Sequence, residues 1–398
     1  MIEKTFDFNN TKDINVDVNY LATILSYSTD KVDVVSVDLK NKQIKVRFSG
    51  AEGKLDRIVK KIINNTGRNI IGNKQLKIYE HSSESATDNG SIWNELLRLG
   101  YVFEYSKGHN GYTGLFLELV NALDSALVEI AKKLNAAEVC LPNFIPCKYI
   151  ANLGLVDEYP HYLIFATHLE KKKSNVINFQ KKFNTKKFSL KKYLSEPKFS
   201  LKTSACSLLY PLIENKKFDT SKYYTVLGHC TRNESSVQSF ERLTEFNMRE
   251  IIYVGNEKEH KNFQHISLKM FEDICIEFDL TGDISVANDS FFITNYEKLK
   301  FAQMLGCNKY EANIYISETD RSIAVASFNN HHNFFSKRFN FNMADEEAVS
   351  SCVGFGLERL AYGIISQHGI NKEKILPMVD KFRKKYTDIN KDFVAFQN

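Results

Sequence analysis

The stretch CTRNESSVQSFERLTEFNMREIIYVG, residues 230–255, places arginines, glutamates and an aromatic residue between two segments typical of β-strands. On a β-strand, residues i and i+2 point to the same face, so we expect Arg232 and Glu234 to share one surface of a hairpin. The returning arm then brings Arg242 and Phe246 opposite them. Guanidinium groups bind phosphates, a carboxylate accepts from the adenine amino group, and an aromatic ring stacks on the base. The hairpin therefore predicts a binding surface for a nucleoside triphosphate.

A second segment, SSCVGFGLERLAYGII at 351–366, predicts a strand that leads into a helix, with G-x-G-x-x-R at the junction. Gly354 and Gly356 allow a ligand to approach the backbone closely, and Arg359 falls in the first turn of the helix. A lone G-x-G-x-x-R motif is weak. Because it follows the arginine hairpin along the chain, we expect both to face one pocket.

The rest of the chain must supply the elements that hold these side chains. With 398 residues, of which 43% are hydrophobic, it is long enough for more than one domain. Residues 33–48 alternate in polarity like a hairpin, 55–63 have helical spacing, and 75–80 predict a third strand. These elements predict a small ββαβ domain at 1–90, and a polar linker separates it from a larger domain at 91–398.

Composition limits where the protein works. No run of 18 apolar residues occurs, and the N-terminus MIEKTFDFNN lacks the basic and apolar regions of a signal peptide, so we expect a cytoplasmic protein without a membrane span. The seven cysteines form no C-x-x-C pair, which favours reduced thiols or scattered metal ligands over a disulfide framework. A net charge of +5 neither demands nor excludes a nucleic-acid partner.

Two further segments bear on partners. Residues 115–134 predict a long amphipathic helix that leads into a short strand ending at Pro142. Helix, strand and proline in this order occur at symmetric dimer interfaces, so we predict a homodimer. Residues 168–194 carry paired and tripled lysines between apolar residues. This pattern is typical of a solvated surface, and it also suits an acidic partner such as a nucleic acid.

The three features in order, helix–strand–proline, arginine hairpin and G-x-G-x-x-R helix, resemble the motifs of class II aminoacyl-tRNA synthetases. The resemblance implies an α+β fold whose catalytic core is an antiparallel sheet flanked by helices. TSACSLLYP at 203–211 resembles a segment shared by the amino acid:[carrier protein] ligases and the related methanogen-type seryl-tRNA synthetases. Four more segments resemble the carrier-protein ligases: EYPHYLIF (158–165), ANDSFF (287–292), SFNNHHNFF (327–335) and CVGFGLER (352–359).

The resemblance also implies a metal site. Its motif positions match Cys206, Glu250 in M-R-E, and Cys352. Two thiolates and a carboxylate suit Zn²⁺, and three protein ligands leave a fourth position open for the amino group of a substrate. Ser327, Asn329 and His331 are candidates for the lining of the substrate pocket.

For the nucleotide, the resemblance implies that Arg232 binds the α-phosphate of ATP and Glu234 the adenine amino group. Phe246 stacks on the base, while Arg242 and Arg359 bind the terminal phosphates together with Mg²⁺. Arg232 and Arg359 are therefore the predicted catalytic residues.

The activity that follows is ATP-dependent activation of glycine, alanine or serine as an aminoacyl adenylate. The acceptor is then the phosphopantetheine thiol of a carrier protein. tRNA is not expected as a partner, because residues 1–90 contain no long heptad-patterned arm. Two alternatives stay open: a seryl-type tRNA synthetase, and a non-catalytic amino-acid sensor that keeps the fold.

Overall fold

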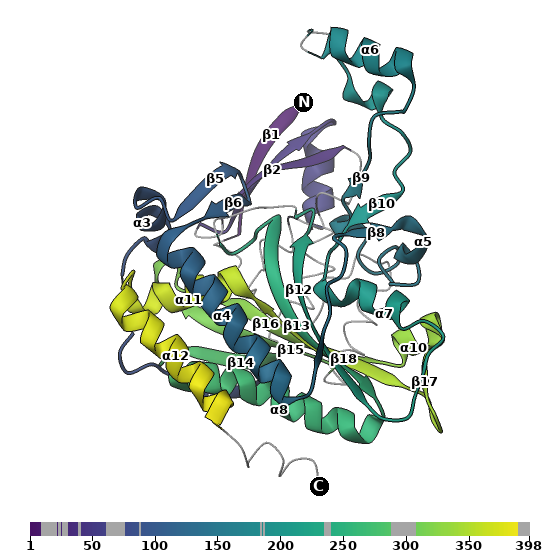
Figure 1. Ribbon diagram of the computed structural model, residues 1–398. Helices are drawn as coiled ribbons and strands as arrows, with labels where there is room; N and C mark the ends of the chain where they lie inside the picture. The colour runs from purple at the N-terminus through teal and green to yellow at the C-terminus, as the bar shows by residue number, and fades with distance from the viewer. Residues whose placement is uncertain are drawn as a thin grey trace.

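A computed structural model gives the architecture (Figure 1). The structure describes residues 1–8, 22, 25, 31–38, 41–60, 76–86, 89–183, 185, 188–234, 240–287 and 308–388.

The centre of the protein is an eight-stranded sheet in the order β4-β14-β15-β16-β18-β13-β12-β7. Neighbouring strands pair antiparallel except β12 and β7, which pair parallel. This confirms the predicted antiparallel sheet. The strands, in sheet order, are Lys77–His81, Gly282–Val286, Lys309–Ile316, Arg321–His332, Val349–Gly356, Glu245–Gly255, Lys222–Thr231 and Ala137–Glu138.

Long helices cover one face of this sheet (Figure 1). They are α4 (Gly114–Lys133), α8 (Glu257–Glu277), α11 (Leu357–His368) and α12 (Lys372–Asp388). The predicted helix at 115–134 is α4, whose buried residues recur at helical spacing. Asn256 is the N-cap of α8, and its side chain accepts from the Glu259 backbone N–H. Their apolar faces and the sheet share one large core.

The opposite face carries shorter elements around a second core. These are α5 (Cys147–Ile150), a 3-10 turn at Ala205–Leu208, α7 (Leu209–Leu212), α10 (Phe334–Phe339), the pair β11 (Lys217–Phe218) and β17 (Asn342–Met343), and the sheet β8-β10-β9 (Phe144–Pro146, Phe199–Leu201, Phe165–Ala166). Alternation along β13 separates the two cores: Ile251 and Tyr253 belong to the helical side, Ile252 and Val254 to the other side.

The N-terminal part differs in one respect from the predicted ββαβ unit. The hairpin β2 (Val32–Asp38) and β3 (Gln43–Phe48) forms as predicted, and a helix over 52–60 follows it. The third strand of this small sheet, however, is β1 (Ile2–Asp7). The strand predicted at 75–80 forms as β4 but pairs with β14 at the edge of the large sheet, so its assignment to the small unit is wrong. A domain boundary near residue 90 stays a prediction.

The remaining elements flank the sheet. Helix α3 (Ile92–Arg98) and the hairpin β5 (Val102–Ser106) with β6 (His109–Tyr112) precede α4. The lysine-rich segment folds as α6 (Lys173–Lys182) and a 3-10 turn at Leu190–Tyr193, which extend away from the body of the protein (Figure 1). Among the described helices, none is long and apolar enough to cross a bilayer.

One buried ion pair ties the sheet to α4. Arg249 on β13 is 3% exposed, and it donates from Nε and Nη2 to both oxygens of Asp124 on α4, at 2.6 and 2.8 Å. A third bond, 3.2 Å from Nη1, reaches Glu138 on β7. The guanidinium therefore joins three elements at the back of the strand that carries Glu250.

We predict that Arg249→Met lowers the free energy of unfolding by about 3 kcal/mol, because it leaves Asp124 without its buried partner. Urea denaturation followed by circular dichroism measures this change. Arg98→Met is the matched control, since Arg98 is 68% exposed and pairs with Glu95 in water. Its effect should stay within about 0.5 kcal/mol, and equal effects of the two substitutions would contradict the prediction.

Candidate active site

Three adjacent strands bring distant parts of the chain to one place. In the register of β13 and β18, Glu250 lies opposite Gly354. In the register of β18 and β16, Cys352 lies opposite Asn329 and Gly354 opposite Ser327. Because side chains alternate across a sheet, these residues can project from the face that carries the second core.

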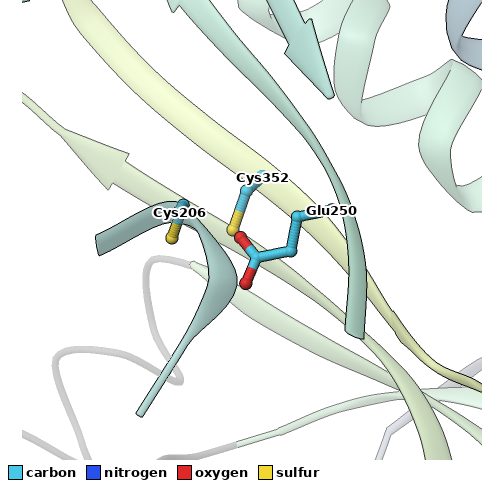
Figure 2. A group of neighbouring side chains, drawn as sticks. All are labelled: Cys206, Glu250 and Cys352. Atoms are coloured by element: carbon cyan, nitrogen blue, oxygen red, sulfur yellow. The ribbon is translucent and has the colours of Figure 1, made fainter. Parts of the chain in front are cut away.

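Cys206, Glu250 and Cys352 come together on this face, with one ligand atom from each within 4.8 Å of the others. Figure 2 shows the Cys352 sulfur beside the Glu250 carboxylate, with Cys206 on the adjacent turn. All three residues are buried, at 6%, 2% and 5% exposure for Cys206, Glu250 and Cys352. Burial of three acidic groups in one cluster is costly without a cation.

The hydrogen bonds of Glu250 leave one of its oxygens for a ligand. Oε1 accepts from the Ala205 backbone N–H at 2.8 Å, whereas Oε2 is buried without a hydrogen bond among the described residues. Gly354 provides the necessary space, because a Cβ there would lie 3.2 Å from Glu250 Cγ and 2.9 Å from Met248 Sδ. This glycine thus serves close packing of β13 side chains.

The pKa shifts in the cluster are those expected of acidic groups that are buried without a cation. Contact with Cys352, burial and Glu250 raise the pKa of Cys206 well above its ordinary value. The Cys206 contact lowers the pKa of Cys352, but burial and Glu250 outweigh it and the net shift is upward. Burial likewise raises the pKa of Glu250. Two sulfurs and a carboxylate oxygen form a donor set for Zn²⁺, and a bound cation would reverse these shifts.

The predicted pocket residues line the strand beside the cluster. Asn329 donates from Nδ2 to Cys352 Sγ at 3.7 Å and to Ser327 Oγ at 3.2 Å. His331 Nε2 lies 3.7 Å from the same sulfur, and its Nδ1 lies 3.1 Å from the Tyr210 hydroxyl. The structure thus places Asn329 and His331 next to Cys352, and Ser327 next to Asn329. Residues 288–292 of the ANDSFF segment lie outside the described residues.

The residues of the hairpin that are predicted to bind the nucleotide lie in or beside the connection between β12 and β13. The expectation that Arg232 and Glu234 lie on the strand itself is wrong, because β12 ends at Thr231 and β13 begins at Glu245. Both residues, and Arg242, belong to the connection between the strands, where Arg242 Nη1 donates to Glu234 Oε2 at 2.9 Å.

Phe246 is the one member of the set on a strand, opposite Cys230. The guanidinium of Arg232 lies 5.1 Å from the Phe246 ring centroid and 5.4 Å from that of Tyr162. Its Nε donates to the Thr203 carbonyl at 3.0 Å. Two aromatic rings and a backbone bond therefore fix this arginine close to the turn that carries Cys206.

Arg359 lies in the first turn of α11, as predicted. Its Nη1 donates to the Ala324 carbonyl at 3.0 Å and its Nη2 to the Glu241 carbonyl. Burial lowers its pKa to about 10, and Arg242 and Arg232 contribute to this shift while Glu234 opposes it. The bond to the Glu241 carbonyl joins Arg359 to the connection that carries Arg242, whereas a shared nucleotide pocket stays a prediction.

Three supporting residues were not foreseen from the sequence. Glu358, beside Arg359, accepts from the Asn247 backbone N–H at 2.9 Å and so holds β13 to α11. Arg321 donates to both oxygens of Glu241, at 2.6 and 2.8 Å, and thereby holds the connection next to Arg242. The Tyr162 ring packs against the guanidinium of Arg232. Glu358 and Tyr162 lie within quoted motifs, but nothing in the sequence pairs them with these partners.

The lysine-rich segment lies apart from these groups. Its aromatic residues pack on one another, with ring centroids of Phe179 and Phe188 5.8 Å apart and of Phe188 and Tyr193 5.6 Å apart. No residue of α6 is buried, and its lysines are solvated. The structure is consistent with the solvated surface predicted there, and an acidic partner stays a prediction.

Comparison with known structures defines the class of the fold. The M. kandleri SerRS, solved in complex with A. aeolicus tRNASec, matches with a TM-score of 0.69 over 97% of this chain and 78% of that one, at 17% identity. The cytoplasmic serine-tRNA ligase of Naegleria fowleri matches with a TM-score of 0.58 over 83% of this chain and 79% of its own, at 11% identity. The protein therefore has the class II aminoacyl-tRNA synthetase fold.

Sequence comparison narrows this class to two kinds of relative. The type-2 serine–tRNA ligase of Methanocaldococcus jannaschii is 24% identical over 312 residues, which are 73% of this chain and 59% of that protein. The amino acid–[acyl-carrier-protein] ligase 2 of Bradyrhizobium diazoefficiens is 25% identical over 267 residues, 66% of this chain and 79% of that protein. No protein-family model matches the chain. The predicted resemblance is thus confirmed, although the chain spans only about three fifths of the M. jannaschii ligase.

The buried carboxyl of Glu358 makes stability depend on pH. Burial raises the pKa of Glu358 to about 6, although hydrogen bonds from Asn247 oppose the shift. A raised carboxyl pKa means that the folded state binds a proton that the unfolded state has released. This contribution to stability is therefore complete below the unfolded pKa and is lost as pH rises through about 6.

We predict that wild type loses about 2 kcal/mol of stability relative to Glu358→Gln between about pH 4 and about pH 7. Urea denaturation of both proteins across this range measures the difference. Glu196→Gln, at an exposed carboxyl, is the control and should show no such trend relative to wild type. A constant difference between wild type and Glu358→Gln at every pH would contradict the predicted pKa.

Proposed function

We propose that the protein uses ATP to activate a small amino acid as an aminoacyl adenylate. The observation that carries this proposal is the connection between the two groups of site residues. Thr203 binds Arg232 of the nucleotide clamp through its carbonyl, and two residues later Ala205 donates to Glu250 of the cysteine cluster. One short segment therefore contacts both the residues that we propose for ATP and the cluster that we propose for the amino acid.

The residues of the chain act by positioning and by charge. Arg232 binds the α-phosphate, Phe246 stacks on the adenine, and Arg242 and Arg359 bind the terminal phosphates. Glu234 accepts from the adenine amino group through a carboxylate that also pairs with Arg242. A carboxylate oxygen of the amino acid then bonds to the α-phosphorus while the bond to the bridging oxygen breaks, and diphosphate leaves.

Cys206, Glu250 and Cys352 would hold Zn²⁺, as the partnerless Glu250 Oε2 and the shifted pKa values support. The ion supplies a Lewis acid that accepts a free amine, and this selects amino acids over hydroxy acids. Ser327, Asn329 and His331 limit the space next to it. Glycine, alanine and serine are the substrates that we propose, and Mg²⁺ accompanies ATP.

For the acceptor we propose the phosphopantetheine thiol of a carrier protein, whose sulfur displaces AMP to give an aminoacyl thioester. The Bradyrhizobium ligase, 79% of which this chain spans, supports this choice. tRNA is the second candidate. The type-2 serine–tRNA ligases among the relatives favour it, so the comparisons do not support the expectation that tRNA is no partner. A homodimer and a cytoplasmic location remain part of the proposal.

Amino-acid-dependent ATP–diphosphate exchange tests activation directly. We expect exchange with at least one of glycine, alanine and serine, and a loss of about 100-fold or more in Arg359→Met, because the charge on the departing diphosphate loses its partner. Arg338→Met, at an exposed arginine, is the control. A wild-type protein without exchange would favour the sensor.

Mass spectrometry after incubation with a holo carrier protein or with tRNA identifies the acceptor. We expect aminoacylation of the phosphopantetheine arm and none of a carrier protein whose attachment serine is changed to alanine. Charging of tRNA alone would replace the carrier protein in this proposal.

Metal analysis tests the cysteine cluster without reference to activity. We expect about one Zn²⁺ per chain in wild type, and close to none in Cys206→Ser and Glu250→Ala, because each loses one of three ligands. Cys230→Ala is the matched control, since Cys230 is buried in the same core but is no member of the cluster. Unchanged zinc in both ligand variants would contradict the assignment.

A further inference from the structure

A buried lysine directly precedes the segment 203–205, which contacts both Arg232 and Glu250. Lys202 is 1% exposed, and its Nζ has no hydrogen-bond partner among the described residues. A buried ammonium group without an anion is unfavourable by several kcal/mol, so proteins rarely keep one without a use. Thr203, whose carbonyl binds Arg232, is the next residue along the chain.

The backbone holds Lys202 firmly. Its N–H donates to the Asn143 carbonyl at 3.1 Å, and its carbonyl accepts from the Thr231 N–H at 2.7 Å. The residue thus bridges the end of β12 and the segment before β8. A main-chain movement that carried the amine to solvent would break both of these backbone hydrogen bonds.

Gly228 on β12 makes room for the amine. A Cβ at this glycine would lie 3.3 Å from Lys202 Nζ and 2.4 Å from Ala205 Cβ. Lys202 Nζ therefore lies over the strand next to Ala205, the residue that donates to Glu250. Lys202 and Glu250 form no ion pair with each other, although both have a buried atom without a partner.

The two partnerless atoms, Lys202 Nζ and Glu250 Oε2, flank one turn of chain and have opposite charge. An amino acid has the complementary arrangement, with its amino group and its carboxylate on neighbouring carbons. With the amino group at the cysteine cluster, the carboxylate extends toward the clamp, where it must meet the α-phosphate. An ammonium group at this point would bind the oxygens of either anion.

We propose that Lys202 is a substrate-binding residue whose ammonium group binds the anionic oxygens where the amino-acid carboxylate meets the α-phosphate of ATP. This inference rests on the proposed function, which it extends by one residue. The anionic oxygens can belong to the amino-acid carboxylate or to the α-phosphate, and the KM for each substrate distinguishes the two. Lys202 then brings together the two reacting anions, which otherwise repel each other.

The test compares Lys202→Met, which keeps the length of the side chain and removes its charge, with Lys198→Met at an exposed lysine. In ATP–diphosphate exchange with saturating zinc, we expect kcat/KM to fall by about 100-fold in Lys202→Met and to be unchanged in Lys198→Met. A rise in KM confined to the amino acid identifies the carboxylate as the ligand, and one confined to ATP identifies the phosphate. Unchanged kinetics would overturn the inference.

Thermal denaturation is a second measurement. A purely structural role of Lys202 predicts a lower Tm in Lys202→Met, and a binding role does not. Because Lys202→Met removes a buried charge without a partner, we expect a Tm equal to or above that of wild type in buffer alone. A Tm several degrees lower, or a variant that does not fold, would show that the fold itself requires the amine and would overturn the inference.

The two proposals fail in different ways. If wild type catalyses exchange and Lys202→Met does so equally, only the role of Lys202 is wrong. If wild type catalyses no exchange, the proposed function is wrong. The role of Lys202 is then tested by the increase in Tm that Mg-ATP causes in each protein. A smaller shift in Lys202→Met than in wild type would support an anion site at this residue, and equal shifts would overturn it.

Discussion

The site depends on one constraint, the antiparallel register of β16, β18 and β13. This register sets Ser327, Gly354 and Glu250 in one row across the sheet, and Asn329 and Cys352 in the next. Because side chains alternate, a shift of one residue in β13 would turn Glu250 into the helical core and Arg249 out of it. Arg249 opposes such a shift through its buried bonds to Asp124.

The segment from Lys202 to Cys206 connects the loops of the site, as the register connects its strands. It contributes a cysteine, donates a backbone N–H to Glu250, and accepts from Arg232. The segment thus contacts an acidic group, Glu250, and an arginine, Arg232, and burial raises the pKa of Glu250 and lowers that of Arg359 in α11. Separated charges of this kind suit a reaction in which a zwitterion meets a polyanion.

Much of this arrangement follows from local patterns. Periodicity located α4, the G-x-G-x-x-R motif located α11, and the order of the motifs indicated the class of fold. The failures have physical causes. β4 has the sequence of a strand, but local strand preference does not determine which strand it pairs with. Its partner β14 lies some 200 residues away in the chain. Arg232 and Glu234 lie beyond the strand ends, whose position depends on which backbone groups find partners.

The sequence by itself determined the chemical inventory: the arginines, the carboxylates, the thiols and the glycines that allow close packing. It also determined the period of each element, because side-chain spacing along a helix or strand is a local property. Only the tertiary structure decided that β4 joins the large sheet, that Glu241 is held by Arg321, and that Lys202 lies buried beside Gly228. These outcomes depend on contacts between residues far apart in the chain, and their energies arise only when packing excludes water from the groups involved.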